Sequence, residues 1–288
     1  MGVLRQFLDR PEGRVSALRE LLADQELTDT LLRLALRARG YDNFRNGEES
    51  GEHHFVRAVL GRLDIRLCLD AGAFRGGYSR LLLEQLEGCR VLAFEPLPAN
   101  HAVLSDLKRV YPERLTVEPL GLGHCPGTLS LAYNPETPYL ASFCEGLEEI
   151  EYLSFTHSIS VGLTSIDTYV ETHPQWSPLD FIKIDTEGYE AEVLQGACAT
   201  LARFRPKAVQ IEFNRHHMFR GHTLLSLARR LEGYIMFQLL PRQLVRRDPA
   251  SPLANFFHFS NFAFLRSDLL ELFRGSETVT GAGLSATR

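Results

Sequence analysis

The 288-residue sequence lacks the features that mark several classes of protein. No apolar run is long enough to cross a bilayer, and charges interrupt the apolar residues near the start, so neither a membrane span nor a signal peptide is predicted. The five cysteines are scattered without a CxxC pair, which argues against a zinc knuckle or a redox dithiol. We therefore expect a cytoplasmic protein whose thiols are reduced and mostly buried.

Neither sign of charge dominates the chain. With 31 Lys and Arg residues against 36 Asp and Glu residues, the formal net charge is −5, which gives no positive field for nucleic acid. The basic pairs Arg229-Arg230 and Arg246-Arg247 are too short to form a phosphate-binding stripe and are expected on the solvated surface. A nucleic-acid partner is therefore not expected.

Residues 1–60 are predicted to form a helical N-terminal extension. Leucines between Leu18 and Leu36 recur mostly at helical steps among charged residues, and a turn-rich link leads to a second helix around residues 51–60. The extension could cover the remaining chain or serve as an oligomer face, so a homo-oligomer through these helices is a candidate assembly. At the other end, residues 271–288 are small and polar and are expected to be a flexible tail.

Residues 61–270 alternate between short apolar runs and helical stretches. Strands are predicted at 65–69, 90–94, 115–119, 181–184 and 208–212, with two late strands at 234–239 and 261–265. Helical spacing is found at 79–86, 100–110 and 189–204. This order predicts an α/β domain with a doubly wound, mostly parallel seven-stranded sheet that includes an antiparallel edge. Ligands of such sheets lie beyond the carboxyl ends of the strands.

The strongest local signal is a glycine turn between a strand and a helix. In the segment LCLDAGAFRGGYS, residues 67–79, the strand ends at Asp70, Gly72 allows the backbone to approach a ligand, and Gly76 or Gly77 tolerates a tight entry to the helix. A turn of this kind can also join a strand to a helix without binding anything.

A second acid strengthens the first signal. The strand at 90–94 ends at Glu95-Pro96, and in a βαβ unit this carboxylate is expected beside the glycine turn. There it can accept hydrogen bonds from the ribose hydroxyls of a nucleoside. A solvated strand end is the alternative, but the two features together predict a nucleoside site.

Two later strands also end in acids. In DFIKIDTEGYE, residues 180–190, Lys183 and Asp185 share one face of a strand because side chains alternate. Their function could be substrate chemistry, or Lys183 could pair with an acid for structure while Glu187 or Glu190 caps the next helix.

The next strand ends at Glu212 and is followed by two adjacent histidines, His216 and His217. Both residue types can accept a proton or bind a metal. On an extended backbone adjacent histidines point in opposite directions and are poor joint ligands, so each is expected at the surface.

Taken together, these segments resemble the FkbM family of S-adenosylmethionine (SAM)-dependent methyltransferases. The likeness runs in the same order and with similar spacing through residues 70–79, 94–100, 165–167, 181–190 with 193–197, and 212–214. It implies a class I methyltransferase fold, which is Rossmann-like, with SAM as cofactor.

Within that resemblance, Asp70 and Gly72 are expected near the methionine part of SAM and Glu95 on its ribose. The full set of predicted cofactor-binding residues is Asp70, Gly72, Ala73, Gly76, Ser79, Glu95 and Pro96. The chain departs from the family pattern at Phe74-Arg75 and at Gly123-His124, and the second departure leaves the adenine contacts unassigned.

The reaction implied by the resemblance is O-methylation of a hydroxyl on a small molecule, a sugar or another glycan, or a natural product. Asp185 is the first candidate for the group that takes the hydroxyl proton or orients the acceptor, Glu212 is the second, and Lys183 completes the catalytic set. No metal site is predicted because the acids do not make a complete ligand set. Residues 134–161, rich in Pro, Tyr, Phe and Glu, are expected to cover the acceptor.

Two other functions are compatible with parts of the pattern. An NAD(P)-dependent oxidoreductase would also use the glycine turn and Glu95, although no Tyr-x-x-x-Lys pair follows the nucleotide half. A non-catalytic nucleoside-binding module is the other alternative, if the helical extension drives assembly and no acceptor turns over.

Overall fold

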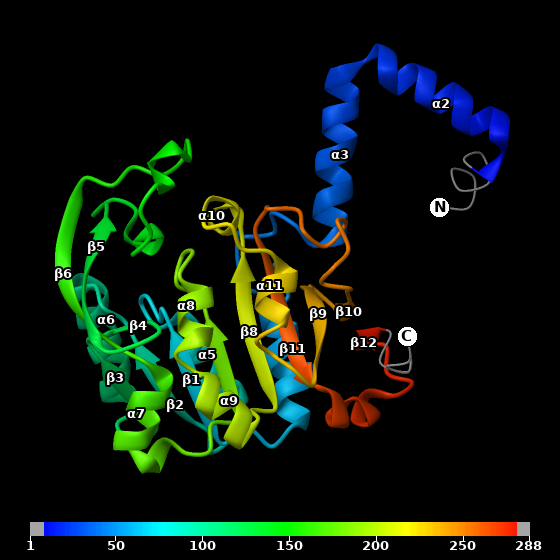
Figure 1. The fold of residues 1–288 in the computed structure, drawn as a ribbon. Coiled ribbons are helices and arrows are strands. Elements are labelled where there is room, and N and C mark those ends of the chain that lie inside the picture. The colour runs from blue at the N-terminus through cyan, green and yellow to red at the C-terminus, as the bar shows by residue number, and fades with distance from the viewer. Residues whose placement is uncertain (1–8, 281–288) are drawn as a thin grey trace. The chain divides into compact units, whose positions relative to one another are not determined.

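The computed structural model describes residues 9–280 and divides the chain into two units, residues 1–42 and 43–288 (Figure 1). The first unit contains helices α2 (Pro11–Ala23) and α3 (Gln25–Arg39). Asp24 caps α3 by accepting a hydrogen bond from the backbone N–H of Leu27 at 2.9 Å, and Gly40 ends it in the left-handed conformation. The division falls at residue 42, whereas the sequence placed the limit of the helical extension at residue 60.

A nine-stranded sheet organises the second unit, in the order β12-β10-β9-β11-β8-β7-β1-β2-β3. The parallel strands are β1 (Leu67–Ala71), β2 (Arg90–Phe94), β3 (Leu115–Glu118), β7 (Phe181–Ile184) and β8 (Ala208–Phe213). The antiparallel side comprises β9 (Tyr234–Leu240), β10 (Gln243–Arg246) and β11 (Ser260–Arg266). The predicted doubly wound sheet with an antiparallel edge is confirmed. The chain crosses over between β1 and β7, the switch point where such sheets bind ligands.

Two short strands extend the sheet beyond the seven that the sequence predicts. One is β10, and the other is β12 (Val279–Thr280), which pairs with β10 in parallel. Strand β12 lies inside residues 271–288, the segment expected to be a flexible tail, and residues 281–288 lie outside the described residues.

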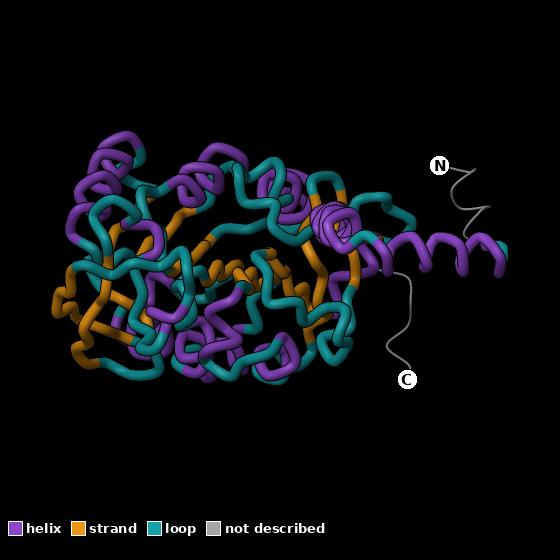
Figure 2. Tube along the Cα trace, turned by 90° about the horizontal axis from the view of Figure 1, so that it is seen from above, coloured by secondary structure: helices purple, strands orange, loops and turns teal. Residues whose placement is uncertain are grey.

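Helices cover both faces of the sheet, as the view from above shows (Figure 2). Their bounds are α4 (Glu52–His54), α5 (Gly77–Gln85), α6 (Pro98–Val110), α7 (Ile166–Thr172), α8 (Glu190–Gln195), α9 (Cys198–Phe204), α10 (Arg215–Phe219) and α11 (Leu224–Ala228). A π-helical turn at Phe55–Val59 continues α4, and 3₁₀ turns lie at Leu60–Arg62, Pro138–Leu140, Leu147–Glu149, Pro174–Trp176 and Ser267–Phe273. The single helix expected at 189–204 is broken at Gly196, where α8 ends. Among the described residues, no helix combines the length and apolar character needed to cross a membrane.

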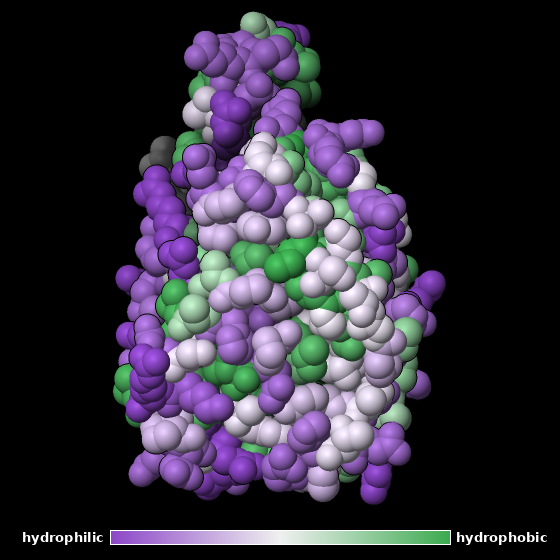
Figure 3. All heavy atoms as spheres, turned by 90° about the vertical axis from the view of Figure 1, so that its left-hand side faces the viewer, coloured by the Kyte–Doolittle hydropathy of each residue, from purple (hydrophilic) through white to green (hydrophobic). Residues whose placement is uncertain are grey.

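A separate three-stranded sheet was not predicted. It consists of β4 (Gly121–Leu122), β6 (His157–Thr164) and β5 (Gly127–Tyr133), in that order. Most of β5 is exposed, so its strand lacks the apolar run that marked the central strands. Figure 3 looks onto the side that carries β5 and β6, where polar residues surround smaller groups of apolar ones.

The core changes from apolar to polar along one face of the central strands. Cys68 of β1, Phe181 of β7 and Ala208 of β8 lie side by side, and all three belong to the buried cluster that also contains residues of α5 and α6. Two residues further along these strands, Asp70, Lys183 and Gln210 form the next row. Because side chains alternate along a strand, Asp70 and Lys183 lie on the same face of the sheet as the apolar row, but nearer its carboxyl edge.

Gly72 makes the bend after β1 possible. Its φ is +78°, and a Cβ built on it would lie 1.8 Å from the carbonyl oxygen of Asp185. Any side chain at this position meets both a backbone clash and a left-handed conformation that residues other than glycine rarely adopt. The bend after β1 and the end of β7 are therefore in direct backbone contact.

Gly72→Ala is expected to lower the free energy of unfolding by at least about 3 kcal/mol, because strain and the clash with Asp185 add together. Gly77→Ala is the matched control, since a Cβ at Gly77 meets nothing within 4 Å and Gly77 begins α5. The control should leave stability unchanged or raise it by up to about 1 kcal/mol. Urea unfolding of both variants measures the difference, and equal stabilities would contradict this account of the bend.

Candidate active site

Backbone hydrogen bonds hold the glycine bend against the end of β2. The N–H groups of Gly72 and Ala73 donate to the carbonyl oxygen of Phe94 at 3.1 and 3.0 Å. The N–H of Phe74 donates to Glu95 Oε2 at 2.8 Å, and that of Leu97 donates to Glu95 Oε1 at 2.9 Å. Glu95 therefore lies beside the bend, where the βαβ argument expected it.

Glu95 is almost fully buried, and its charge is correspondingly costly. Burial raises the pKa of Glu95 to about 7, although the N–H groups of Leu97 and Phe74 and the amide of Asn100 favour its ionised form. Among the described residues, Oε2 accepts a hydrogen bond only from the Phe74 N–H, which leaves it capacity for another donor. The Glu95 carboxylate can therefore accept a hydrogen bond from a ligand hydroxyl.

Asp70 and Ser79 form a fully buried pair at the start of α5. The Ser79 hydroxyl donates to Asp70 Oδ2 at 2.6 Å, while Asp70 Oδ1 is buried and has no hydrogen-bond partner among the described residues. Burial raises the pKa of Asp70, and the Lys183 ammonium and the Ser79 hydroxyl oppose that rise. Because an unpaired buried oxygen is costly, Asp70 Oδ1 is suited to accept a bond from a bound group. Ser79 holds Asp70 in place from inside the core.

Gly76 and Pro96 lie just before the helices α5 and α6. Gly76 precedes α5 with φ +80°, and a Cβ there would meet the side chains of Leu104 and Leu107. Its lack of a side chain therefore allows α5 to pack against α6. Pro96 is half-buried and lies between Glu95 and Leu97, at the turn into α6.

Lys183 and Asp185 make a close ion pair at the end of β7. Lys183 Nζ donates to Asp185 Oδ2 at 2.7 Å and lies 4.9 Å from the centroid of the Tyr78 ring. Burial alone would lower the pKa of Lys183, but the carboxylates of Asp185, Asp70 and Glu52 outweigh it and raise the pKa. Lys183 therefore stays protonated and cannot accept a proton. The Asp185 side chain is 25% exposed against 5% for Lys183, so Asp185 is the partner that a ligand can reach.

Three carboxylates meet at the ends of β7 and β8. One oxygen from each of Asp185, Glu187 and Glu212 lies within 4.8 Å of the others. The Asn214 amide donates to Glu212 Oε1 at 2.8 Å and to Glu187 Oε2 at 3.4 Å. Burial and the neighbouring acids raise the pKa of Glu212, and burial raises that of Glu187. Such a group could hold a hard cation.

The expectation that His216 and His217 lie at the surface is wrong, because both are fully buried. The backbone is not extended there. Asn214 caps α10 by accepting from the N–H of His216 at 2.9 Å, and the short helix turns both rings inward. His216 Nδ1 lies 3.0 Å from Glu187 Oε2, and His217 Nε2 lies 3.2 Å from Glu190 Oε2.

In both pairs the histidine acts to lower the pKa of its acid, but only at Glu190 does this outweigh burial. Glu190 Oε1 also accepts from the N–H groups of Thr186 and Gly188, at 2.8 and 3.3 Å. Burial acts to raise the pKa of Glu190, but His217 and the N–H of Thr186 outweigh it and lower the pKa to about 2. The Glu187 carboxylate outweighs burial at His216 and raises the pKa of that histidine. Glu190 thus acts as a structural anchor of the loop after β7.

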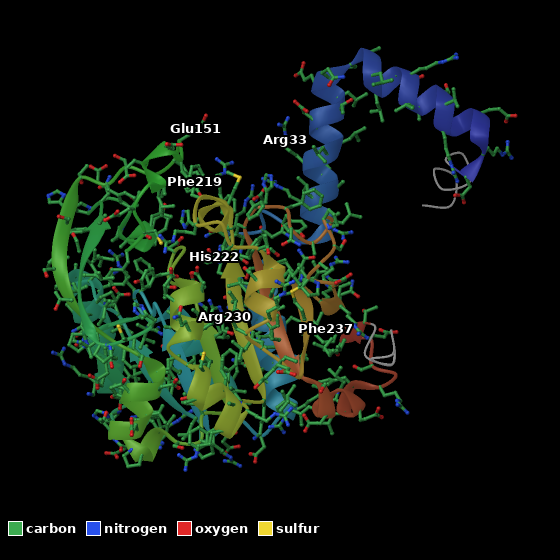
Figure 4. The ribbon with its side chains drawn as sticks, viewed as in Figure 1. Arg33, Glu151, Phe219, His222, Arg230 and Phe237 are labelled. Atoms are coloured by element: carbon green, nitrogen blue, oxygen red, sulfur yellow. The ribbon has the colours of Figure 1, made fainter. Side chains whose placement is uncertain are left out.

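The segment 134–161 contacts both halves of the site. The Tyr139 ring packs edge-on against Phe74 of the glycine bend, with centroids 6.2 Å apart. The Ser142 hydroxyl donates to the carbonyl oxygen of Glu187 at 2.7 Å, and the Tyr152 ring lies 6.3 Å from that of His216. Phe219 of α10 (labelled in Figure 4) packs against a buried cluster that Cys144, Leu147, Ile150 and Leu153 of this segment form with Tyr189.

Sequence reasoning did not single out Tyr139, Ser142 or Tyr152. The only available signal was the aromatic composition of the segment, which predicted a cover without naming its contacts.

A doubly wound sheet with a glycine bend after β1, an acid after β2 and acids after β7 and β8 defines a class I methyltransferase fold. Residues 70–239 match the family model described as "Methyltransferase FkbM domain", and the chain belongs to this family, as its resemblance predicted.

Two curated relatives are named as methyltransferases. "Methyltransferase 1" of Beauveria bassiana (strain ARSEF 2860) is 23% identical over 148 residues, which cover 46% of this chain and 59% of that protein. "Methyltransferase sdnD" of Sordaria araneosa is 30% identical over 152 residues, which cover 44% of this chain and 59% of that protein. The chain thus spans somewhat over half the length of these relatives.

Solved structures with a similar fold include two methyltransferases. The FkbM methyltransferase from Methylobacillus flagellatus KT is 20% identical, with a TM-score of 0.46, over 70% of this chain and 44% of that one. The O-methyltransferase from Bacillus cereus in complex with SAH is 12% identical, with a TM-score of 0.43, over 82% of this chain and 89% of that one.

Glu190→Gln is expected to lower the free energy of unfolding by about 3 kcal/mol at pH 7, because it leaves His217 without its buried partner. The pKa of Glu190 lies below its ordinary value, so its contribution is complete above pH 4.5 and is lost as the pH falls toward 2. The gap between wild type and variant should narrow over that range in denaturant unfolding. Exposed Glu149→Gln is the control and should change stability by less than about 0.5 kcal/mol.

Proposed function

We propose that this FkbM-family protein is a SAM-dependent O-methyltransferase that acts on a hydroxyl of a small molecule or glycan. The observation that carries the proposal is the position of Glu95 beside the Gly72 bend. The backbone of Asp185 contacts the same bend, and the Asp185 carboxylate is partly exposed. Methyl transfer itself follows from the family. The family match does not favour the oxidoreductase alternative.

The residues around the bend fit a nucleoside with an attached amino acid. Glu95 would accept hydrogen bonds from the ribose hydroxyls, and the unpaired Asp70 Oδ1 would accept one from the methionine part. Gly72 and Ala73 would let the ligand approach the backbone, whereas Ser79, Gly76 and Pro96 would support the bend from behind. SAM, when bound, supplies a methyl group on a positively charged sulfur that leaves as a neutral thioether.

The chain's contribution to the reaction would be alignment and removal of one proton. Asp185 is the first candidate to take the acceptor's hydroxyl proton, because it is the most exposed of the three clustered acids and Lys183 fixes its position. Glu212 is the second candidate, since its raised pKa favours proton uptake. Lys183 would be a positioning residue because it stays protonated.

The acceptor is proposed to bind under the segment 134–161. Tyr139 reaches the glycine bend, and Ser142 and Tyr152 reach the loop after β7, so this segment covers the space next to both. Aromatic side chains flanking a few polar groups suit a ring-shaped, partly apolar acceptor and help to exclude water.

Titration calorimetry with SAM and with NAD tests the cofactor. SAM should bind and NAD should not, and NAD binding in place of SAM would overturn the proposal. Detection of an added methyl group by mass spectrometry, across a panel of hydroxylated small molecules and glycans, separates an enzyme from a non-catalytic nucleoside-binding module.

Asp185→Asn is expected to reduce methylated product at least about 100-fold while the SAM Kd changes less than twofold, because the amide cannot accept the proton. Asp106→Asn, at an exposed position in α6, is the control and should keep full turnover. If Asp185→Asn keeps full turnover and Glu212→Gln loses it, the proton goes to Glu212 instead.

SAM affinity should rise with pH through the pKa of Glu95, about 7, because the ionised carboxylate is the better acceptor for ribose hydroxyls. Between pH 6 and pH 8 the ionised fraction changes up to about tenfold, which sets the largest expected change in Kd. Calorimetry at both pH values should show this change in wild type and in Glu113→Gln, an exposed control. An unchanged pH dependence in Glu95→Gln would show that another group is responsible.

A further inference from the structure

Helices α2 and α3 carry many apolar side chains that the structure leaves exposed. They are Val15, Leu18, Leu22, Leu27, Leu31, Leu32 and Leu34. Single exposed leucines are ordinary on a protein surface, but a set this dense on two consecutive helices is typical of an interaction surface.

On α3 the exposed leucines form a regular stripe. Leu27, Leu31 and Leu34, followed by Ala38, are separated by alternating steps of four and three residues. At about 100° per residue, these positions fall on one narrow face, which is the spacing by which two helices interlock side chains. Leu32 is equally exposed but lies about 130° from the centre of the stripe.

Charge along α3 is divided between its two halves. Glu26 and Asp29 lie in the first half, and Arg33, Arg37 and Arg39 in the second. Glu26 and Arg37 flank the leucine stripe on the same side, one near each end of the helix. In a two-fold antiparallel pair the same flanks of both helices meet, so Glu26 of each copy would face Arg37 of the other. A parallel pair would bring opposite flanks together, so Glu26 and Arg37 would not face each other.

We propose that the α3 stripe is the interface through which two copies of this chain associate, with the two α3 helices antiparallel. In that arrangement Leu31 meets its own counterpart near the two-fold axis, and Leu27 and Leu34 of the two copies alternate on either side. A membrane surface is the less suitable occupant, because helices that lie in the interface carry a polar face rich in cations, whereas α3 mixes both signs. This assembly does not depend on the proposed methyl transfer.

Sedimentation equilibrium of the full chain tests the proposal. Wild type should have twice the 32.5 kDa mass of one chain, and Leu31→Glu should raise the dimer Kd at least about 100-fold, because it puts two carboxylates at the centre of the interface. Leu32→Glu, the same change outside the stripe, should leave the Kd within about threefold. The circular dichroism spectra of both variants should match that of wild type, which shows that they are folded.

Charge exchange tests the antiparallel orientation. Glu26→Arg and Arg37→Glu should each weaken the dimer at low salt, and the double variant should restore it, because the opposite charges again face each other. Asp29→Arg, on the far face of α3, should have little effect. A monomeric wild type at 100 µM, a dimer insensitive to Leu31→Glu, or failure of the double variant to restore association would each overturn the proposal. The proposal would also be overturned if the chain did not self-associate but bound lipid vesicles, and Leu31→Glu abolished that binding.

Discussion

The backbone contact between Gly72 and the carbonyl oxygen of Asp185 is the constraint on which the site depends. It brings the turn that follows β1 to the tip of β7 across the switch point of the sheet. The hydrogen bonds from the N–H groups of Gly72 and Ala73 to the carbonyl oxygen of Phe94 then fix the same turn to the end of β2. Three strand ends are thereby locked together through main-chain atoms, so the carboxylates they carry keep their spacing without relying on flexible side chains.

A second constraint is the cost of burying so many charges. Lys183 lies among Asp185, Asp70 and Glu52, and the network is closed by Gln210, which donates to Glu52 at 3.0 Å and to Asn261 at 2.8 Å. Around it the histidines of α10 face the acids after β7. Buried polar groups are costly without partners, and the Asp70 oxygen is one of several such atoms among the described residues; its place beside the glycine bend is what suits it to a ligand.

Much of the fold could be predicted because the central strands carry near-continuous apolar runs, which are typical of a sheet covered on both faces. Glu95 could be placed for the same reason, since parallel strand ends share one edge. The burial of His216 and His217 could not be predicted from their adjacency in the sequence, because α10 begins at the Asn214 cap and the backbone at both histidines is helical rather than extended. The sheet of β4, β5 and β6 escaped prediction because its exposed strands lack the apolar signal, and with it the contacts of Tyr139 and Ser142 were missed.

The position of Lys183 also shapes how this sequence can change. Its ammonium balances acids from β1, from the end of β7 and from α4, so losing it strands several negative charges in the interior at once. Replacing any one of those acids instead changes the electrostatic environment of the others. Substitutions at these positions are therefore expected to occur together. A library that randomises them one at a time would miss the combinations that still fold.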